Sequence, residues 1–253
     1  MTPKDSLARF SDRVDDYVKY RPGYPPQVID VLRSRCGLTA SAVIADIGSG
    51  PGNLARLFLD NGNEVFAVEP NAEMREAGQQ LLGSRSGYHS VDGRAEATRL
   101  NNASVDFVTA AQAFHWFDWP HAKAEFRRIL RPSGWAVLLW NERLTDSTPF
   151  LREYESLLLR YGTDYKDVRH ERSYENISDF FGGKPDGTVM PNQQLVDFDG
   201  LRGRLLSSSY VPSADSPQRE PMLRDLKDLF ATHQRNARVS IDYEVRMYFG
   251  RLG

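Results

Sequence analysis

Short apolar runs alternate with amphipathic stretches through the middle of the chain. Five apolar runs have the length of strands, and the third is the weakest: residues 42–47, 64–68, 88–91, 105–110 and 135–140. Three stretches between them carry apolar side chains at helical spacing: residues 54–59, 71–82 and 121–130. Apolar strands separated by helices are typical of a parallel sheet that is covered on both faces. The pattern therefore predicts an α/β fold for this region.

The two ends of the chain follow different patterns. The first 40 residues are polar, aromatic and rich in turns, although residues 27–35 predict a helix. In the last third, helices are predicted at residues 149–161 and 222–230, and a strand at residues 193–198. Residues 162–190 are polar and irregular. Apolar and mostly polar residues alternate strictly through residues 239–249, which predicts a long, half-buried, antiparallel strand.

Composition and charge narrow the classes of function. The 253 residues, 40% hydrophobic and 26% charged, are ordinary for a globular protein. The formal net charge of −2 provides no global positive field for a nucleic-acid backbone, so we expect no nucleic-acid partner. The single cysteine, Cys36, excludes an internal disulfide and a cysteine-rich zinc site. It fits a reducing cytoplasm, where we expect the protein to act.

Neither a membrane partner nor a metal is expected. No apolar run approaches the length that spans a bilayer, and residues 1–10 lack the apolar core of a signal peptide. Four histidines have no metal-ligand spacing: His89, His121, His170 and His233.

A glycine-rich turn, Asp-Ile-Gly-Ser-Gly-Pro-Gly at residues 46–52, follows the first predicted strand. Gly48, Gly50 and Gly52 allow the backbone to approach a ligand closely, although a plain tight turn is the alternative. The dinucleotide fingerprint requires a glycine where Asn53 stands, and no Lys-Ser or Lys-Thr pair follows as in a phosphate-binding loop. The Asp46 carboxylate disfavours a pyrophosphate and suits an ammonium group, or else braces the loop. The turn therefore predicts a nucleoside-like ligand that carries an amino acid.

Glu69 ends the second predicted strand, 23 residues after Asp46. A carboxylate at this position can accept two hydrogen bonds from ribose hydroxyls. A solvated carboxylate at a strand end is the alternative.

Together these residues resemble motifs I and II of class I S-adenosylmethionine-dependent methyltransferases, which here comprise residues 46–52, Glu69-Pro70-Asn71 and Met74. Gly-Arg-Ala-Glu at residues 93–96 is similar to the adenine-side turn of the family, and residues 129–134 to the turn before its fifth strand. Many relatives carry an aspartate at the position of Arg94, and that aspartate contacts the adenine amino group. Because arginine has no acceptor atom, Arg94 cannot make this contact.

Two further segments resemble one subgroup, the type 11 methyltransferases that include trans-aconitate methyltransferase-like proteins. Ala-Gln-Ala-Phe-His-Trp-Phe at residues 111–117 is similar to its motif after the fourth strand, and residues 17–24 resemble its N-terminal lid. The resemblance covers residues 8–142 well and the remainder loosely.

The resemblance implies a Rossmann-like fold: a doubly wound, seven-stranded, mostly parallel α/β sheet with a C-terminal helical cap and an antiparallel last strand. We expect one domain, residues 1–253, divided into a lid (1–26), a cofactor-binding core (27–142) and a substrate cap with the last strands (143–253). S-adenosylmethionine is the implied cofactor. The implied cofactor-binding residues are Asp46, Gly48, Gly50, Gly52, Glu69, Met74, Ala95, Gln112, Arg21 and Tyr17.

The expected reaction is methyl transfer to a small molecule, a carboxylic acid with an apolar body. Phe114 and Trp116 would line the acceptor pocket, with packing in the core as the alternative. Arg143 would hold the carboxylate through a bidentate pair, with a surface position as the alternative. His115 is the one candidate for a catalytic base, although a role in the pocket wall is favoured because a carboxylate acceptor needs no base. Two other functions stay open: a hydroxyl or amine acceptor that needs a base, and a non-catalytic nucleoside-binding regulator. The sequence predicts no oligomeric state.

Overall fold

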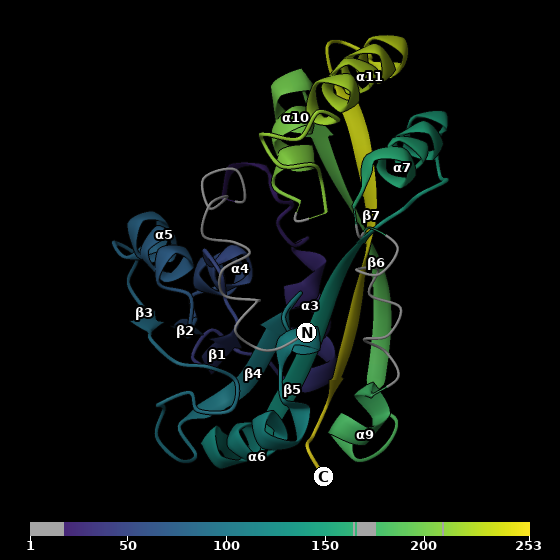
Figure 1. Cartoon of the computed structure of the whole chain (residues 1–253). Coiled ribbons are helices and arrows are strands. Elements are labelled where there is room, and N and C mark those ends of the chain that lie inside the picture. The colour runs from purple at the N-terminus through teal and green to yellow at the C-terminus, as the bar shows by residue number, and fades with distance from the viewer. Residues whose placement is uncertain (1–17, 164, 166–175, 209) are drawn as a thin grey trace.

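A computed structural model describes residues 18–163, 165, 176–208 and 210–253 (Figure 1). These residues form one seven-stranded sheet. Its strands are β1 (Val43–Ile47), β2 (Glu64–Val68), β3 (Tyr88–Val91), β4 (Val105–Ala111), β5 (Leu130–Arg143), β6 (Asp186–Val196) and β7 (Val239–Gly250). The helices whose full bounds lie in the described ranges are α3 (Gln27–Cys36), α4 (Asn53–Asp60), α5 (Ala72–Leu82), α6 (Trp119–Ile129), α7 (Pro149–Tyr161), α9 (Ile177–Phe181), α10 (Phe198–Leu206), α11 (Arg219–His233) and the short 3₁₀ helix η1 (Phe114–Trp116).

The strand order is β3-β2-β1-β4-β5-β7-β6. Strands β1 to β5 pair in parallel, and β7 runs antiparallel between β5 and β6. This confirms the predicted doubly wound sheet and its antiparallel last strand. The strand order reverses at β1 and β4, and ligands of doubly wound sheets bind beyond the carboxyl ends of the strands at such a point.

The central strands β1 and β4 bury both of their faces, as their continuous apolar sequences predict, whereas the edge strand β3 has no fully buried residue. On β1, Ile44 packs against α3 and α4, while Ala45 and Ile47 face the layer that contains α6 and α9. Residues of β5 divide in the same way between these two clusters. The core therefore consists of two apolar layers, one on each side of the sheet.

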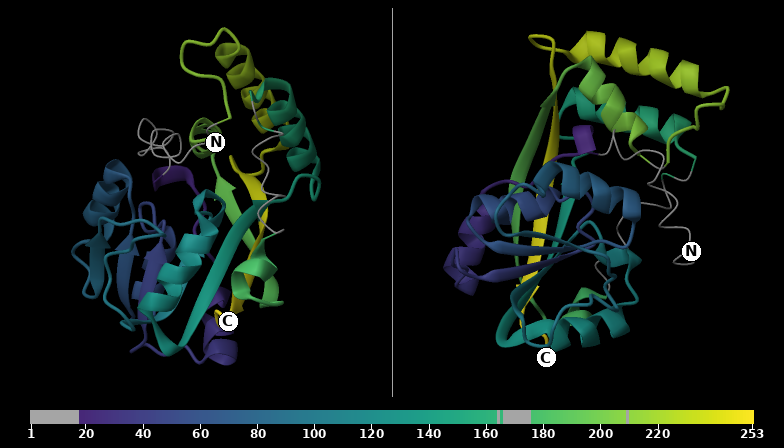
Figure 2. Two further views of the ribbon diagram at one scale, coloured as in Figure 1. Left: turned by 60° about the horizontal axis from the view of Figure 1, so that its bottom comes forward. Right: turned by 90° about the vertical axis from the view of Figure 1, so that its left-hand side faces the viewer.

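A third apolar cluster lies in the cap. Figures 1 and 2 show β5, β6 and β7 running past the carboxyl edge of the other strands, with α7, α10 and α11 gathered around their far ends. Met222 and Leu226 of α11 pack there against Tyr154 of α7 and Leu201 of α10. The long antiparallel strands thus connect the cap to the core.

Two helices were not predicted, α9 and α10, and β6 begins well before the predicted strand. Helix α10 contains Gly200 and Gly203, which weaken the helical signal, although the Asp197 side chain caps its first turn by accepting from the Gly200 amide at 2.8 Å. Strand β6 contains Pro191, which normally argues against a strand. Proline is tolerated here because β6 is the edge of the sheet. No helix in the described part of the chain is long and apolar enough to cross a bilayer.

Candidate functional site

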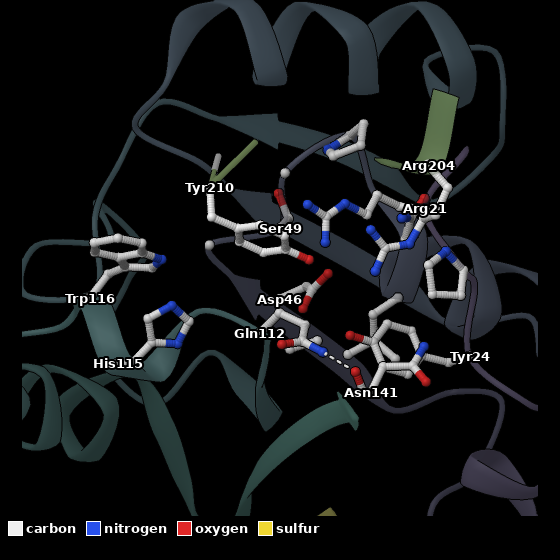
Figure 3. A pocket seen from close by; sticks show the side chains of 17 residues that line it. Arg21, Tyr24, Asp46, Ser49, Gln112, His115, Trp116, Asn141, Arg204 and Tyr210 are labelled. Atoms are coloured by element: carbon white, nitrogen blue, oxygen red, sulfur yellow. Dashed lines mark hydrogen bonds between the residues drawn. The ribbon is translucent and has the colours of Figure 1, made fainter. Parts of the chain in front are cut away.

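A pocket lies where the carboxyl ends of β1 and β4 meet the N-terminal segment and the cap (Figure 3). The lining residues come from five parts of the chain: the end of β1 with the glycine turn and the start of α4, the segment from the end of β4 through η1, Asn141 of β5, residues 21–24, and the cap. They include Arg21, Tyr24, Asp46, Gly48, Ser49, Gly50, Gln112, His115, Trp116, Asn141, Arg204 and Tyr210. The pocket therefore lies at the reversal of strand order.

The glycine turn is held against the ends of β2 and β4. The Gly48 and Ser49 amides donate to the Val68 carbonyl at 2.8 and 3.2 Å. Gly48 has a φ of +66°, and a Cβ atom there would lie 2.6 Å from the Cβ of Ala113, so no other residue fits. Gly50 also lines the pocket, whereas Gly52 does not: its missing Cβ leaves room for the Leu82 side chain.

Asp46 is a buried carboxylate with one oxygen left without a partner. Thr109 Oγ1 donates to Asp46 Oδ1 at 2.9 Å, while Oδ2 has no hydrogen-bond partner among the described residues. Burial raises the pKa of Asp46 to about 7, and the Thr109 hydroxyl and the nearby Ala55 amide oppose this shift only in part. A buried, unsatisfied oxygen beside the pocket suits a donor group on a ligand.

Glu69 joins the glycine turn to the start of α5. Its two carboxylate oxygens accept from the amides of Gly50 and Asn71, each at 2.8 Å. Burial raises the pKa of Glu69, while the two amide hydrogen bonds act to lower it. Neither Glu69 nor Met74 nor Ala95 lines the pocket, although Glu69 touches the turn that does. Their expected roles toward the nucleoside stay predictions.

Gln112 combines a strained backbone with a fixed side chain. Its φ of +57° lies in the left-handed region, which residues other than glycine rarely adopt. The Gln112 amide donates to the Leu139 carbonyl, and the side-chain Nε2 donates to the Asn141 carbonyl at 2.9 Å. Gln112 and Asn141 both line the pocket. Strained backbone conformations tend to occur at such functional sites.

The aromatic motif after β4 splits between pocket and core. His115 and Trp116 line the pocket, with ring centroids 4.8 Å apart. Phe114 is buried instead, and its ring packs edge-on against Trp140 and Phe180 in the layer beneath the sheet. This corrects the expectation that Phe114 lines the acceptor pocket: in the single turn of η1, its side chain points toward the apolar core.

The N-terminal segment is anchored to the last third of the chain. Arg21 lines the pocket and donates to the Ser207 carbonyl at 3.0 Å. Gln194 donates to the Tyr20 carbonyl, and the Tyr20 ring occupies the space where a Cβ of Gly203 would be. Tyr17 and most of the predicted lid lie outside the described residues.

Arg143 does not face the pocket, contrary to prediction. Its Nη2 donates to Glu155 and to the Tyr165 hydroxyl, and its guanidinium lies 5.1 Å from the centre of the Tyr154 ring. The side chain is turned into the cap because Glu155 of α7 supplies its counter-charge there. This arginine is therefore not available to hold the carboxylate of an acceptor.

The cap contributes two pocket residues that sequence reasoning missed, Arg204 and Tyr210. Arg204 lies on α10 and is only 8% exposed. Arg204 stands between Leu201 and Leu205 in a helix that was not predicted, so little in the sequence indicated that it lines a pocket. Burial alone would raise the pKa of Tyr210, but the positive charges of Arg204 and Arg21 outweigh burial and hold it below its ordinary value. No group of three or more metal-ligating side chains occurs within the described ranges.

Comparison with known proteins identifies a consistent set of relatives. The family model described as a methyltransferase domain matches residues 45–138. An uncharacterized methyltransferase of Mycobacterium tuberculosis is 30% identical over 241 residues, which cover 91% of this chain and 88% of that protein. Malonyl-acyl-carrier protein O-methyltransferase of Enterobacter lignolyticus is 31% identical over 216 residues, with 83% and 73% covered.

A solved structure has the same fold. A protein assigned as a type II methyltransferase from Anaeromyxobacter dehalogenans matches with a TM-score of 0.72 at 21% identity, over 92% of this chain and 98% of that one.

Proposed function

Because this chain belongs to the family of S-adenosylmethionine-dependent methyltransferases, we propose that it methylates a small molecule bound in the pocket beside the glycine turn. One observation carries the proposal: Asp46 and the glycine turn share a single pocket with side chains from the cap. One wall thus suits the cofactor and the other an acceptor. Alignment of two reactants within one site is the main contribution of such an enzyme, about 7–11 kcal/mol.

The described residues fit the cofactor. Asp46 Oδ2 is a buried acceptor atom without a partner in the described part of the chain, as the ammonium group of the methionine moiety requires. Gly50 leaves open space where a Cβ would stand, so its backbone is accessible to a ligand. When bound, S-adenosylmethionine supplies an electrophilic methyl group on a sulfonium. We assign Glu69 to the ribose, and Arg21 to the methionine carboxylate.

The acceptor we propose is an acid with an apolar body. Trp116 and Tyr24 offer apolar surface, and Arg204 adds a positive charge to the lining that the cofactor does not take up. The relative named malonyl-acyl-carrier protein O-methyltransferase supports an oxygen acceptor on an acid, since a malonyl group carries a carboxylate, although the name places that group on a carrier protein. A carboxylate is ionised at neutral pH and needs no base. His115 would then shape the pocket, and membership of the trans-aconitate-like subgroup stays a prediction.

A hydroxyl or amine acceptor is the second candidate. It is favoured by His115 and by Tyr210, because the lowered pKa of Tyr210 makes its phenolate more accessible as a base. The variant His115→Gln distinguishes the two. A carboxylate acceptor leaves kcat within about threefold, whereas an acceptor that His115 deprotonates loses a factor of about 10² or more.

Two measurements test the proposed function. Calorimetry should show binding of S-adenosylhomocysteine at micromolar affinity, about −8 kcal/mol, and no binding of NAD. Incubation of metabolite extracts with S-adenosylmethionine labelled in its methyl group should transfer the label to a small molecule. Binding of NAD without binding of S-adenosylhomocysteine would contradict the proposal.

A further inference from the structure

The cap contains two buried arginines that differ in their surroundings. Arg143 is paired with the Glu155 carboxylate. Arg204 is as deeply buried, yet the partners of its guanidinium are neutral: Nε donates to the Tyr243 hydroxyl at 3.3 Å and Nη1 to the Ser208 hydroxyl at 3.1 Å. Within the described ranges no carboxylate forms an ion pair with it, and Nη2 donates no hydrogen bond.

An isolated buried charge is unfavourable. Arginine stays protonated in proteins, so Arg204 cannot relieve the cost of burial by losing its proton. Burial of a charge without a counter-charge costs several kcal/mol, and buried charges in proteins are normally paired. The fold therefore leaves room for an anion that it does not itself supply.

The position of Arg204 indicates where this anion comes from. Arg204 lines the pocket, and Figure 3 shows it beside Arg21, on the side of the pocket away from His115 and Trp116. Asp46 is the only acidic residue among the described lining residues; it lies at the glycine turn and forms no ion pair with either arginine. The positive charge of Arg204 thus faces the pocket from the wall away from His115 and Trp116, so an acid whose apolar body packs against those rings would direct its carboxylate toward Arg204.

We propose that Arg204 selects an anionic acceptor by donating from Nη2 to one oxygen of its carboxylate. This inference rests on the proposed function and replaces the role expected of Arg143. The other carboxylate oxygen is the nucleophile, and a lone pair on this oxygen forms the O–CH₃ bond. The S–CH₃ bond breaks at the same time, and the electron pair of that bond returns to sulfur. The products are a methyl ester and S-adenosylhomocysteine, and no proton is transferred.

The test compares acids with neutral analogues of the same shape. The probes are benzoate, phenylacetate, trans-cinnamate and 4-phenylbutyrate, each with its primary amide. Binding is measured by calorimetry with the protein saturated with S-adenosylhomocysteine, and KM and kcat are measured with S-adenosylmethionine. Wild-type protein should bind and methylate at least one acid and should bind its amide about 30-fold more weakly.

Three variants locate the effect. Arg204→Met, which removes the charge at similar volume, should weaken acid binding and raise KM about 30-fold, with affinity for S-adenosylhomocysteine within twofold of wild type. Arg204→Lys should restore part of the preference for acids over amides. Arg202→Met, at an exposed arginine of the same helix, should behave as wild type.

Different outcomes separate this inference from the function on which it rests. Equal binding of acids and amides by wild-type protein, binding of none of the acids, or an unchanged KM in Arg204→Met overturns the role of Arg204. The comparison on wild-type protein stands even if Arg204→Met fails to fold. If wild-type protein does not bind S-adenosylhomocysteine, the proposed function itself is overturned.

Discussion

Burial of Asp46 couples protein stability to pH. Its folded-state pKa of about 7 lies above the ordinary value of 3.8, so the folded protein binds this proton more tightly than the unfolded chain. The resulting stabilisation is fully present below about pH 4 and is lost as the pH rises through about 7. Without cofactor, Asp46→Asn should therefore raise the free energy of unfolding at pH 8 by about 1–3 kcal/mol. Urea unfolding at pH 5 and pH 8 measures the difference.

The same carboxylate makes cofactor binding depend on pH. The ionised form is the one that accepts from an ammonium group, so affinity for S-adenosylhomocysteine should rise as the pH increases from 6 to 8 in wild-type protein. Asp46→Asn should bind more weakly and lose this dependence. A wild-type affinity that is flat across this range would contradict the assignment of Asp46.

Glu69 affects both the turn and the ligand. Glutamine can accept at only one atom, so Glu69→Gln cannot keep both hydrogen bonds from the Gly50 and Asn71 amides. We expect affinity for S-adenosylhomocysteine to fall by about 1.5–3 kcal/mol in calorimetry. Glu73→Gln, at an exposed residue in the first turn of α5, serves as the matched control and should bind as wild type. Equal affinities of the two variants would contradict the role of Glu69.

At the scale of elements, the contact between residue 20 and α10 links the N-terminal segment to the cap. A Cβ at position 203 would lie 2.0 Å from the Tyr20 ring. Gly203→Ala should therefore displace Tyr20, although alanine favours the helix by about 1 kcal/mol. Tryptic cleavage after Lys19 should accelerate at least about tenfold in folded protein. Tyr20→Ala should have a similar effect, and the double variant should be no faster than Tyr20→Ala alone. If trypsin cleaves Gly203→Ala at the same rate as wild-type protein, the contact between Tyr20 and α10 does not hold the segment.

The parallel half of the sheet was predictable because its signals are local. The apolar strands, the Asn71 cap and the glycine turn lie within short segments, and the structure reproduces them. The cap was less predictable: α10 has glycines in its interior and β6 contains Pro191, and only tertiary packing overrides these signals. For the same reason the sequence did not indicate that Arg143 turns away from the pocket. Its ion pair with Glu155 of α7 is a contact that no local pattern encodes.

At the scale of the whole molecule, the pocket is assembled from distant parts of the chain. Asp46, Gln112 and Arg204 reach it from β1, the end of β4 and α10. The two sides of the site therefore differ in how they can be perturbed. Changes at the glycine turn should affect every acceptor equally, whereas changes on α10 should alter acceptor choice without weakening cofactor binding. Parallel measurements of S-adenosylhomocysteine affinity and acceptor KM in the variants above test this division.

Pro191 also has a consequence for how copies of this protein meet. Strand β6 forms the open edge of the sheet, and on it Val189 and Leu195 are 52% and 58% exposed. An exposed apolar edge is a template on which another chain can add as a strand, the first step of aggregation. Proline has no amide hydrogen, so it interrupts the row of donors that an incoming strand would need. Pro191→Val should restore that row, and light scattering during heating should then show aggregation at a lower temperature than in wild-type protein.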